Sequence, residues 1–257
     1  MNDVRDLRRK NKRRKYRRRR TGFVFAVFSF LVILAAVVAA MTVFFKISDI
    51  KITGQTRYSE EEILEASGIE TGTNMFMINK FASINRMFSK LYYLDEVRVR
   101  RRLPDTVEII VSDTEPVTSI RIADEYWLMD KRCKLLETVD EQKAKEFGIL
   151  EGLEVKNASA GKIIESDDQD KLSKLKEFLT AAYDGGVLKD IKDINFEKLY
   201  DVSFRFEDRF TVNIGSTGDY ERKFRFLLSV SERLSPTDRG EIDLSDPESA
   251  HFRPEQS

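Results

Sequence analysis

One uninterrupted apolar stretch limits what this chain can fold into. Residues 21–45 form a run of 25 residues without a charged side chain. An α-helix crosses the roughly 30 Å hydrocarbon core of a bilayer in about 20 apolar residues. It also pairs its own backbone N–H and C=O groups, as the lipid interior requires. The stretch therefore predicts one transmembrane helix over residues 21–45.

The charges that flank this helix predict its orientation. Residues 1–20 carry twelve Lys or Arg and only two acids, Asp3 and Asp6. Basic segments beside a span stay in the cytoplasm, so we expect a basic cytoplasmic tail and an external part from Lys46 onward. The alternative is a cleaved signal peptide with its cleavage site near residues 38–40. The apolar part of a signal peptide is about 7–15 residues long, so we interpret the helix as an uncleaved anchor in a single-pass membrane protein.

The formal net charge of zero conceals two parts of opposite sign. The chain has 44 basic and 44 acidic residues. Residues 1–20 hold twelve of the basic and two of the acidic ones. Residues 21–257 therefore hold 32 basic and 42 acidic residues, a net charge of −10. Basic tails bind nucleic acid in some proteins. Beside a membrane, each such charge gains about 1 kcal/mol from anionic lipids. We therefore expect the tail to bind membrane lipids, and the acidic external part argues against a nucleic-acid partner.

The chain contains a single cysteine, Cys133, so no intramolecular disulfide can form. Secreted eukaryotic modules of this size usually carry cysteine pairs, which favours a bacterial protein. Cys133 is either a reactive thiol or a partly buried spectator. We favour the spectator, because no histidine lies near it in the sequence.

The residues after the span predict a small α+β domain over residues 46–114, in the order strand, helix, helix, strand, strand. Ser59 and Glu62 are spaced as a capping box at the start of the first helix, and Gly68 is a natural end for it. We expect the two helices to cover one face of a three-stranded sheet. Arginines and Glu108 on the other face predict a solvated charge ladder or a surface for an acidic partner.

Both helices of this domain have candidate core residues. On the first helix we expect three residues to face inward: Ile63, Leu64 and Ala66. The second helix, from about Lys80 to Leu91, carries an apolar stripe at three-to-four spacing. Its members are Phe81, Ile84, Met87, Phe88 and Leu91.

The remainder predicts a second α+β domain, rich in strands, over residues 115–250, and a polar C-terminal tail over 251–257. Alternating apolar residues predict strands at 117–122, 126–129, 191–196, 202–206, 210–214 and 241–244. Apolar residues at helical spacing predict helices at 168–182 and 220–234.

No motif for catalysis, a cofactor or a metal is found in the sequence. It contains no P-loop, no G-x-S-x-G motif and no cluster of metal-ligand residues. His251 is the only histidine and belongs to the expected tail. We therefore expect neither an enzyme nor a cofactor, and we assign no catalytic, cofactor-binding or metal-binding residue.

One segment resembles the signature of a known family. It runs from Arg101 to Val117, turns at Pro104-Asp105-Thr106 and reaches Pro116-Val117 after an alternating strand. In this segment, in the order of elements and in the Ile52-Thr53-Gly54 triplet, the chain is similar to the FtsQ/DivIB division proteins. The resemblance implies a signal anchor, a POTRA domain and a β domain. It also implies a noncatalytic scaffold of the bacterial division machinery, located at the septum.

The resemblance further implies partners and a surface that binds them. The partners are small bitopic coiled-coil division proteins, FtsB/DivIC-like and FtsL-like, and through them the septal wall synthase complex whose peptidoglycan synthesis the protein helps to control. In the family the terminal strand region accepts a strand from such a protein. The residues that this assigns as partner-binding are Ile242, Asp243, Leu244, Ser245, Asp246, Ser249 and Ala250. Pro247 lacks an N–H, so strand pairing must stop or shift there.

Three alternatives remain at this stage. Ile242 and Leu244 are plain core residues if the last strand is buried. The chain as a whole is a POTRA-type sensor or secretion accessory if it binds other partners. It is an anchored cell-wall hydrolase if a catalytic constellation forms only in three dimensions.

Overall fold

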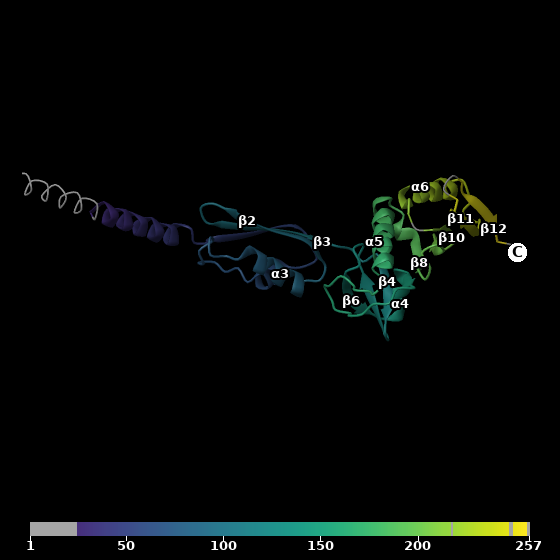
Figure 1. Cartoon of the computed structure of the whole chain (residues 1–257), viewed down its shortest axis with the longest axis horizontal. Helices are drawn as coiled ribbons and strands as arrows, with labels where there is room; N and C mark the ends of the chain where they lie inside the picture. The colour runs from purple at the N-terminus through teal and green to yellow at the C-terminus, as the bar shows by residue number, and fades with distance from the viewer. Residues whose placement is uncertain (1–24, 217, 247–248, 256–257) are drawn as a thin grey trace, which may run out of the picture.

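The computed structural model describes residues 25–216, 218–246 and 249–255. A helix over Phe25–Phe44, a three-stranded sheet and a nine-stranded sheet follow one another along the long axis of the molecule (Figure 1). The helix has a mean hydropathy of 2.7, and none of it is buried within the chain, so it is long and apolar enough to cross a membrane. The predicted basic tail, the first residues of the predicted span and Pro247 lie outside the described residues.

The first sheet has the predicted order of elements. Its strands are β1 (Asp49–Gln55), β2 (Leu94–Arg102) and β3 (Thr106–Asp113), and its helices are α2 (Glu60–Ser67) and α3 (Lys80–Lys90). β3 lies in the centre, parallel to β1 and antiparallel to β2. β2 begins at the end of the sheet where β1 finishes and runs antiparallel to it, so β3 starts where β1 started and can pair with β1 in parallel.

The capping box of α2 is present as predicted, since the Ser59 hydroxyl accepts from the Glu62 N–H and Glu62 accepts from the Ser59 N–H. Two of the expected core residues are exposed: Leu64 on α2 and Phe81 on α3, the latter by 81%. The core predictions for these two residues were wrong. Helical spacing reports which residues share a face, and it does not report where the sheet beneath that face ends.

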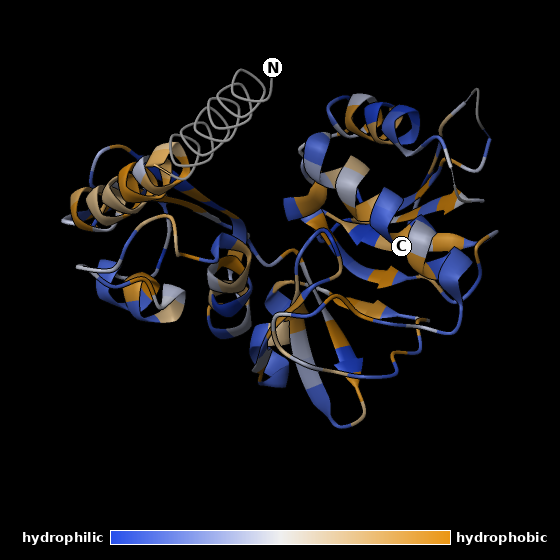
Figure 2. Cartoon of the chain, turned by 60° about the vertical axis from the view of Figure 1, so that its left-hand side comes forward, coloured by the Kyte–Doolittle hydropathy of each residue, from blue (hydrophilic) through white to orange (hydrophobic). Residues whose placement is uncertain are grey.

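The second sheet has the order β12-β11-β10-β9-β8-β7-β4-β5-β6. Its strands are β4 (Thr118–Ile122), β5 (Glu125–Met129), β6 (Leu135–Val139), β7 (Ile149–Glu151), β8 (Ile191–Asn195), β9 (Val202–Phe206), β10 (Phe210–Gly215), β11 (Gly240–Asp243) and β12 (His251–Pro254). The helical elements around it are α4 (Glu141–Glu146), α5 (Gln169–Asp184), η1 (Leu188–Asp190) and α6 (Tyr220–Ser231). Apolar and polar residues alternate along β9 and β10 of this sheet (Figure 2).

A cluster of aromatic rings joins α5 and α6 to this sheet. Phe178 of α5 is fully buried and makes edge-to-face contacts with Phe196, Phe204, Tyr220 and Phe224 at centroid distances of 5.5–5.9 Å. Edge-to-face pairs add about 0.5–1.5 kcal/mol each beyond the apolar area that they bury. The long connection between β7 and β8 therefore packs on the sheet through α5.

The strands and helices predicted for the second domain are all present, and the structure adds β6, α4, β7 and β12. The prediction of a polar tail from His251 was wrong for His251–Pro254, which form β12 against β11. A strand of four residues is too short for its alternation to stand out in the sequence. The domain boundaries at residues 114 and 115 stay a prediction.

Cys133 is fully buried in a turn between β5 and β6, with φ at 62°. Asp130 stabilises the turn, since its Oδ1 accepts from the N–H groups of Arg132 and Lys134, both at 2.9 Å. Burial raises the pKa of the Cys133 thiol to about 12. The thiol therefore stays protonated near neutral pH, as the spectator interpretation requires.

The two sheets contact each other near the β6 end of the larger one. Tyr93, just before β2, forms a small buried cluster with Leu128 and Leu136. Its hydroxyl donates to Glu137 Oε1 at 2.8 Å. The two sheets are thus joined by one small apolar cluster and a hydrogen bond.

Candidate functional site

The candidate site is the outer edge of β12, the end strand of the large sheet and the part of the fold most remote from the span (Figure 1). β11 is paired on both sides, parallel to β10 and antiparallel to β12. Among the described residues β12 pairs only with β11, so one row of its backbone groups faces away from the sheet. Free rows of this kind accept an added strand from another chain.

β12 is held to the sheet by a close backbone approach and one aromatic contact. A Cβ on Gly240 would lie 2.1 Å from the carbonyl oxygen of Arg253, so only glycine lets β12 approach here. Gly240 also has φ at 152°, which other residues rarely adopt. Phe252 packs edge-to-face on Phe210 with a centroid distance of 5.9 Å, and it opposes the buried Ile242 across the ladder.

The register determines which backbone groups are free. Glu255 donates its N–H to the carbonyl of Arg239 at 2.9 Å, which makes this pair a hydrogen-bonded one. Bonded and non-bonded pairs alternate in an antiparallel ladder. Arg253 therefore bonds toward β11, and Phe252 directs its N–H and C=O outward. Pro254 also faces outward but has no N–H, which limits the number of hydrogen bonds that the edge can offer.

The face of β12 opposite Phe252 is charged. The Arg253 guanidinium lies 3.7 Å from a carboxylate oxygen of Glu241 and 3.8 Å from one of Asp243. Hydrogen bonds from the hydroxyl of Ser245 at 2.6 Å and from its N–H at 3.0 Å hold the pKa of Asp243 below its usual value. The edge thus presents an apolar face continuous with the core and a face of alternating charge.

The residues predicted from sequence lie next to this edge, not on it. Ile242 and Asp243 belong to β11, and Leu244 is buried and donates its N–H to the carbonyl of Asn213 at 2.7 Å. The backbones of Ile242 and Asp243 are occupied by strand pairing within the sheet. Their assignment as partner-binding residues stays a prediction.

Four further predicted residues form the connection from β11 to β12. Ser245 and Asp246 are exposed, and Ser249 and Ala250 are half-buried. Sequence reasoning missed Phe252 and the other residues of β12. The only signal was a short one, in His251-Phe252-Arg253, where one apolar residue stands between two polar ones.

The connection also contains the one Ser–His contact of the described residues. The Ser249 hydroxyl donates to Asp246 Oδ2 at 3.0 Å and lies 3.1 Å from His251 Nε2. In a nucleophilic triad the carboxylate holds the histidine, and the histidine takes the proton of the serine. Here the carboxylate holds the serine, so the order of groups differs from that of a triad. In the described parts of the chain, no three His, Cys, Asp or Glu residues are grouped so as to hold a metal ion.

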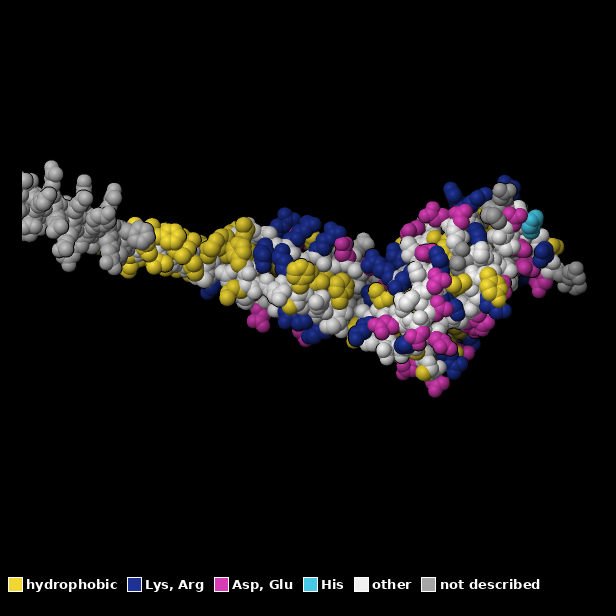
Figure 3. Space-filling view, in the orientation of Figure 1, with side chains coloured by type: hydrophobic (Ala, Val, Ile, Leu, Met, Phe, Trp, Pro, Cys, Tyr) yellow, Lys and Arg dark blue, Asp and Glu magenta, His cyan; other side chains and the backbone are white. Residues whose placement is uncertain are grey.

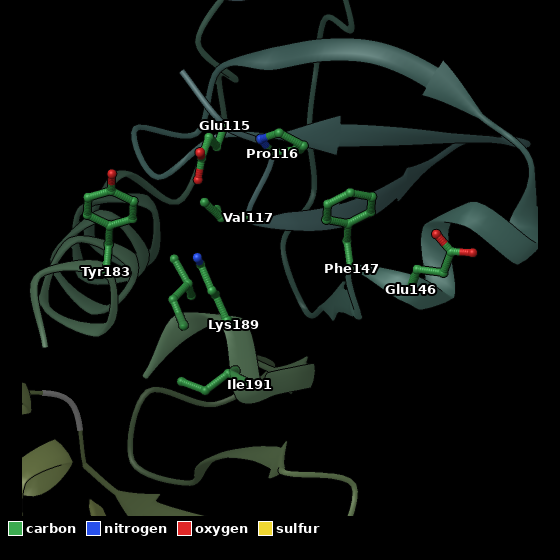
Figure 4. A pocket seen from close by; sticks show the side chains of 9 residues that line it. Glu115, Pro116, Val117, Glu146, Phe147, Tyr183, Lys189 and Ile191 are labelled. Atoms are coloured by element: carbon green, nitrogen blue, oxygen red, sulfur yellow. The ribbon is translucent and has the colours of Figure 1, made fainter. Parts of the chain in front are cut away.

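A hollow of about 420 Å³ lies elsewhere on the large sheet, where the parallel strands β4, β7 and β8 begin (Figure 4). Val117, Phe147 and Ile191 contribute apolar surface, and Tyr183 of α5 lies at one side. Parallel sheets usually bind ligands at the carboxyl ends of their strands. This hollow lies at the amino ends, and we assign it no role.

Comparison with known proteins agrees with the observed fold. Residues 45–113 match the POTRA domain of FtsQ type. The chain is 24% identical to the cell division protein DivIB of Clostridium botulinum strain Loch Maree over 233 residues, which cover 90% of each chain. It is 27% identical to DivIB of Clostridium acetobutylicum over 207 residues, with 79% and 80% of the two chains covered. It is 24% identical to the cell division protein FtsQ of Geotalea daltonii over 214 residues, with 81% and 76% covered.

Proposed function

We propose that this chain, which belongs to the FtsQ/DivIB family of bacterial cell division proteins, is a non-enzymatic scaffold that accepts a strand from a partner at β12. The single observation that carries the proposal is the free outer row of β12, with the outward N–H and C=O of Phe252. The partner is a small bitopic coiled-coil protein of FtsB/DivIC-like type that pairs with an FtsL-like one. Through these two proteins the scaffold helps to control septal peptidoglycan synthesis.

The proposed topology places the partner-binding edge outside the cell. Residues 1–20 carry twelve basic and two acidic residues, which favours a cytoplasmic N-terminus. The β12 edge then lies on the extracytoplasmic side, at the far end of the molecule from the membrane (Figure 1). A partner with its own membrane span must extend a segment outward to reach this edge.

The edge defines the chemistry of that segment. An extended strand pairs with Phe252 through one accepted and one donated hydrogen bond. On the face shared with Phe252 the segment offers an apolar residue, because that face continues the core. On the opposite face it offers an acidic or polar residue, because Arg253 is exposed there.

The test compares two substitutions at one position in the full chain. Phe252→Ala removes the contact with Phe210 and keeps the outward N–H. Phe252→Pro removes the same contact and the outward N–H as well, and it leaves the bonds that Arg253 makes with β11 in place. The measurement is recovery of short coiled-coil membrane proteins with each full-length variant from the membranes of its own bacterium.

We expect Phe252→Pro to lose at least about tenfold more partner than Phe252→Ala, since buried or shielded hydrogen bonds contribute about 0.5–1.5 kcal/mol each and proline also bars the following pairings. Depletion of the protein should give filamentous or chained cells. Equal recovery by the two variants contradicts strand addition at β12. Cells of normal length with altered wall turnover contradict the division role and favour a hydrolase.

A further inference from the structure

The end of the first domain nearest the span is tied directly to the last turn of the span. The Met75 N–H donates to the carbonyl of Phe45 at 2.9 Å, and the Asn74 Nδ2 donates to the carbonyl of Met41 at 2.9 Å. The Gly72 N–H donates to the carbonyl of Ile47 at 2.8 Å. The loop before α3 therefore lies beside the final turn of the span.

Four large apolar side chains are exposed at this end. Phe76 and Met77 belong to the loop, and Phe81 belongs to the first turn of α3. Leu103 lies in the turn between β2 and β3, which the bond from the Ser48 N–H to the carbonyl of Asp105 (2.8 Å) holds beside the start of β1. Their exposed fractions are 48% for Phe76, 80% for Met77, 81% for Phe81 and 63% for Leu103. We call these four residues the apolar cap.

The surface of the span and the surface of the first domain form one apolar band. Figure 3 shows hydrophobic side chains continuing from the helix onto the adjoining end of the domain. Phe45 contacts Phe76 edge-to-face with a centroid distance of 5.1 Å, which joins the two surfaces. Scattered apolar residues need no explanation, but a contiguous patch marks a contact surface.

The level of the loop along the span indicates that lipid is what contacts the apolar cap. The described helix over Phe25–Phe44 has 20 residues and is therefore about 30 Å long, close to the thickness of the hydrocarbon core. Met41 lies inside its last turn, so Asn74, which bonds to Met41, is at the level where hydrocarbon meets headgroups. Phe76 and Met77 follow Asn74 directly.

The charges around the cap fit the same level of a membrane. Arg101 donates to the carbonyls of Met75 at 2.8 Å and Ile78 at 3.1 Å, and its guanidinium lies 5.6 Å from the centre of the Phe76 ring. Lys80 directly follows the loop in the sequence, and Lys46 forms an isolated β-bridge with Asn74 of the loop. Basic side chains at this depth extend their charged ends to the lipid phosphates while their stems cover apolar surface.

We propose that the apolar cap inserts into the interfacial layer of the leaflet from which the span emerges, so that the first domain rests on the membrane. The span and the cap then hold the domain at several points instead of one flexible joint. This inference depends on the helix crossing a membrane, and it does not depend on the partner proposed for β12.

The test measures the depth of the cap in the full chain reconstituted in phosphatidylcholine–phosphatidylglycerol nanodiscs. The only tryptophan, Trp127, is first removed by Trp127→Phe. Met77→Trp then places an indole in the cap, and Tyr200→Trp places a matched indole at an exposed aromatic position of the second sheet domain. Quenching of each indole by lipids brominated near the headgroup end of the acyl chains reports contact with the bilayer.

We expect quenching of the indole from Met77→Trp to be several-fold stronger than that from Tyr200→Trp, with a shift of its emission to shorter wavelength. Phe81→Trp should behave like Met77→Trp, which guards against a local effect of one substitution. Equal quenching at Met77→Trp and Tyr200→Trp overturns the proposal. So does an emission shift without quenching, because it means that a second copy or another protein segment covers the cap.

Discussion

The two end strands of the large sheet differ in whether their outer backbone groups are covered. The outer row of β6 is covered by the chain itself, since the Leu135 N–H donates to the carbonyl of Lys162 at 2.9 Å and the Gly161 N–H donates to the carbonyl of Leu135 at 2.7 Å. β6 also meets the first domain through Leu136 and Glu137. β12, at the other end, receives no such cover from the described residues.

The difference shows that the two edges of the sheet serve different purposes. An uncovered edge promotes association with other chains, and proteins usually shield it. One end of this sheet is used to join the two domains. The other end stays short, limited by Pro254, and available.

The largest effect is expected from Gly240→Ala, which pushes β12 off the sheet. The added Cβ collides with the carbonyl of Arg253, and φ at 152° is strained for alanine. We expect a loss of about 3 kcal/mol in the free energy of unfolding and faster amide hydrogen exchange in β11 and β12. Gly186→Ala, with φ at 72° and nothing near its Cβ, is the control for backbone strain alone. Similar losses for both variants would mean that the close approach of β12 contributes nothing.

Leu136→Ala weakens the packing at β6, the covered end of the large sheet. Leu136 is fully buried against Tyr93 and Leu128, so the substitution leaves a cavity between the domains. We expect a loss of about 2–3 kcal/mol, measured by chemical denaturation of the full chain. Recovery of the partner through β12 should stay at the level of the unaltered protein. A drop in recovery equal to that of Phe252→Pro would show that the two ends are coupled.

Tyr93→Phe removes only the hydrogen bond to Glu137 and should cost about 1 kcal/mol near neutral pH. Burial, with the hydrogen bond to Glu137, raises the pKa of Tyr93 to about 12 from an ordinary value of 10.0. Because the unfolded chain ionises this group first, its stabilising contribution is complete below pH 10 and is lost as the pH rises toward 12. The free energy of unfolding of the unaltered protein should thus fall more steeply over this range than that of Tyr93→Phe. Parallel curves would contradict the assignment.

The smallest effect is expected from Asp243→Asn at the open end. Hydrogen bonds from Ser245 lower the pKa of Asp243 below 3.8. The carboxylate therefore stabilises the fold above that value, and its contribution disappears as the pH falls through the lower folded value. We expect a loss below about 1 kcal/mol at pH 7 that shrinks as the solution is acidified below pH 3.8. Asp124→Asn, at a side chain that is 99% exposed, is the control for the substitution and should leave the free energy of unfolding at pH 7 within about 0.5 kcal/mol of that of the unaltered protein.

Local patterns predicted most helices and strands because each depends on neighbours in the sequence. The capping box at Ser59 and Glu62 is an example, since both hydrogen bonds close within four residues. Phe81 is the counterexample. Its spacing correctly placed it on the apolar stripe of α3, but its exposure depends on a sheet end that the spacing does not encode.

The partner-binding residues predicted from the sequence lie beside the free edge of the large sheet, and their assignment stays a prediction. The apolar residues Ile242 and Leu244 predicted a last strand, and both are core residues. Ile242 lies in β11, and Leu244 is the first residue but one after Ile242, directly past the end of β11. The actual edge is β12, four residues with a single apolar side chain toward the core. Its position depends on the close approach at Gly240 and on the Phe210–Phe252 contact, both between residues far apart in sequence.

The sequence by itself determined an apolar helix long enough to cross a membrane, the opposite charges of the two parts and the order of elements in the first domain. Each of these follows from hydropathy, charge or spacing along a continuous segment. Only the tertiary structure decided which edge of the large sheet stays free and that exposed apolar side chains gather where the span ends. Both depend on distant segments meeting in space, where burial and backbone pairing are settled by neighbours that the local sequence does not contain.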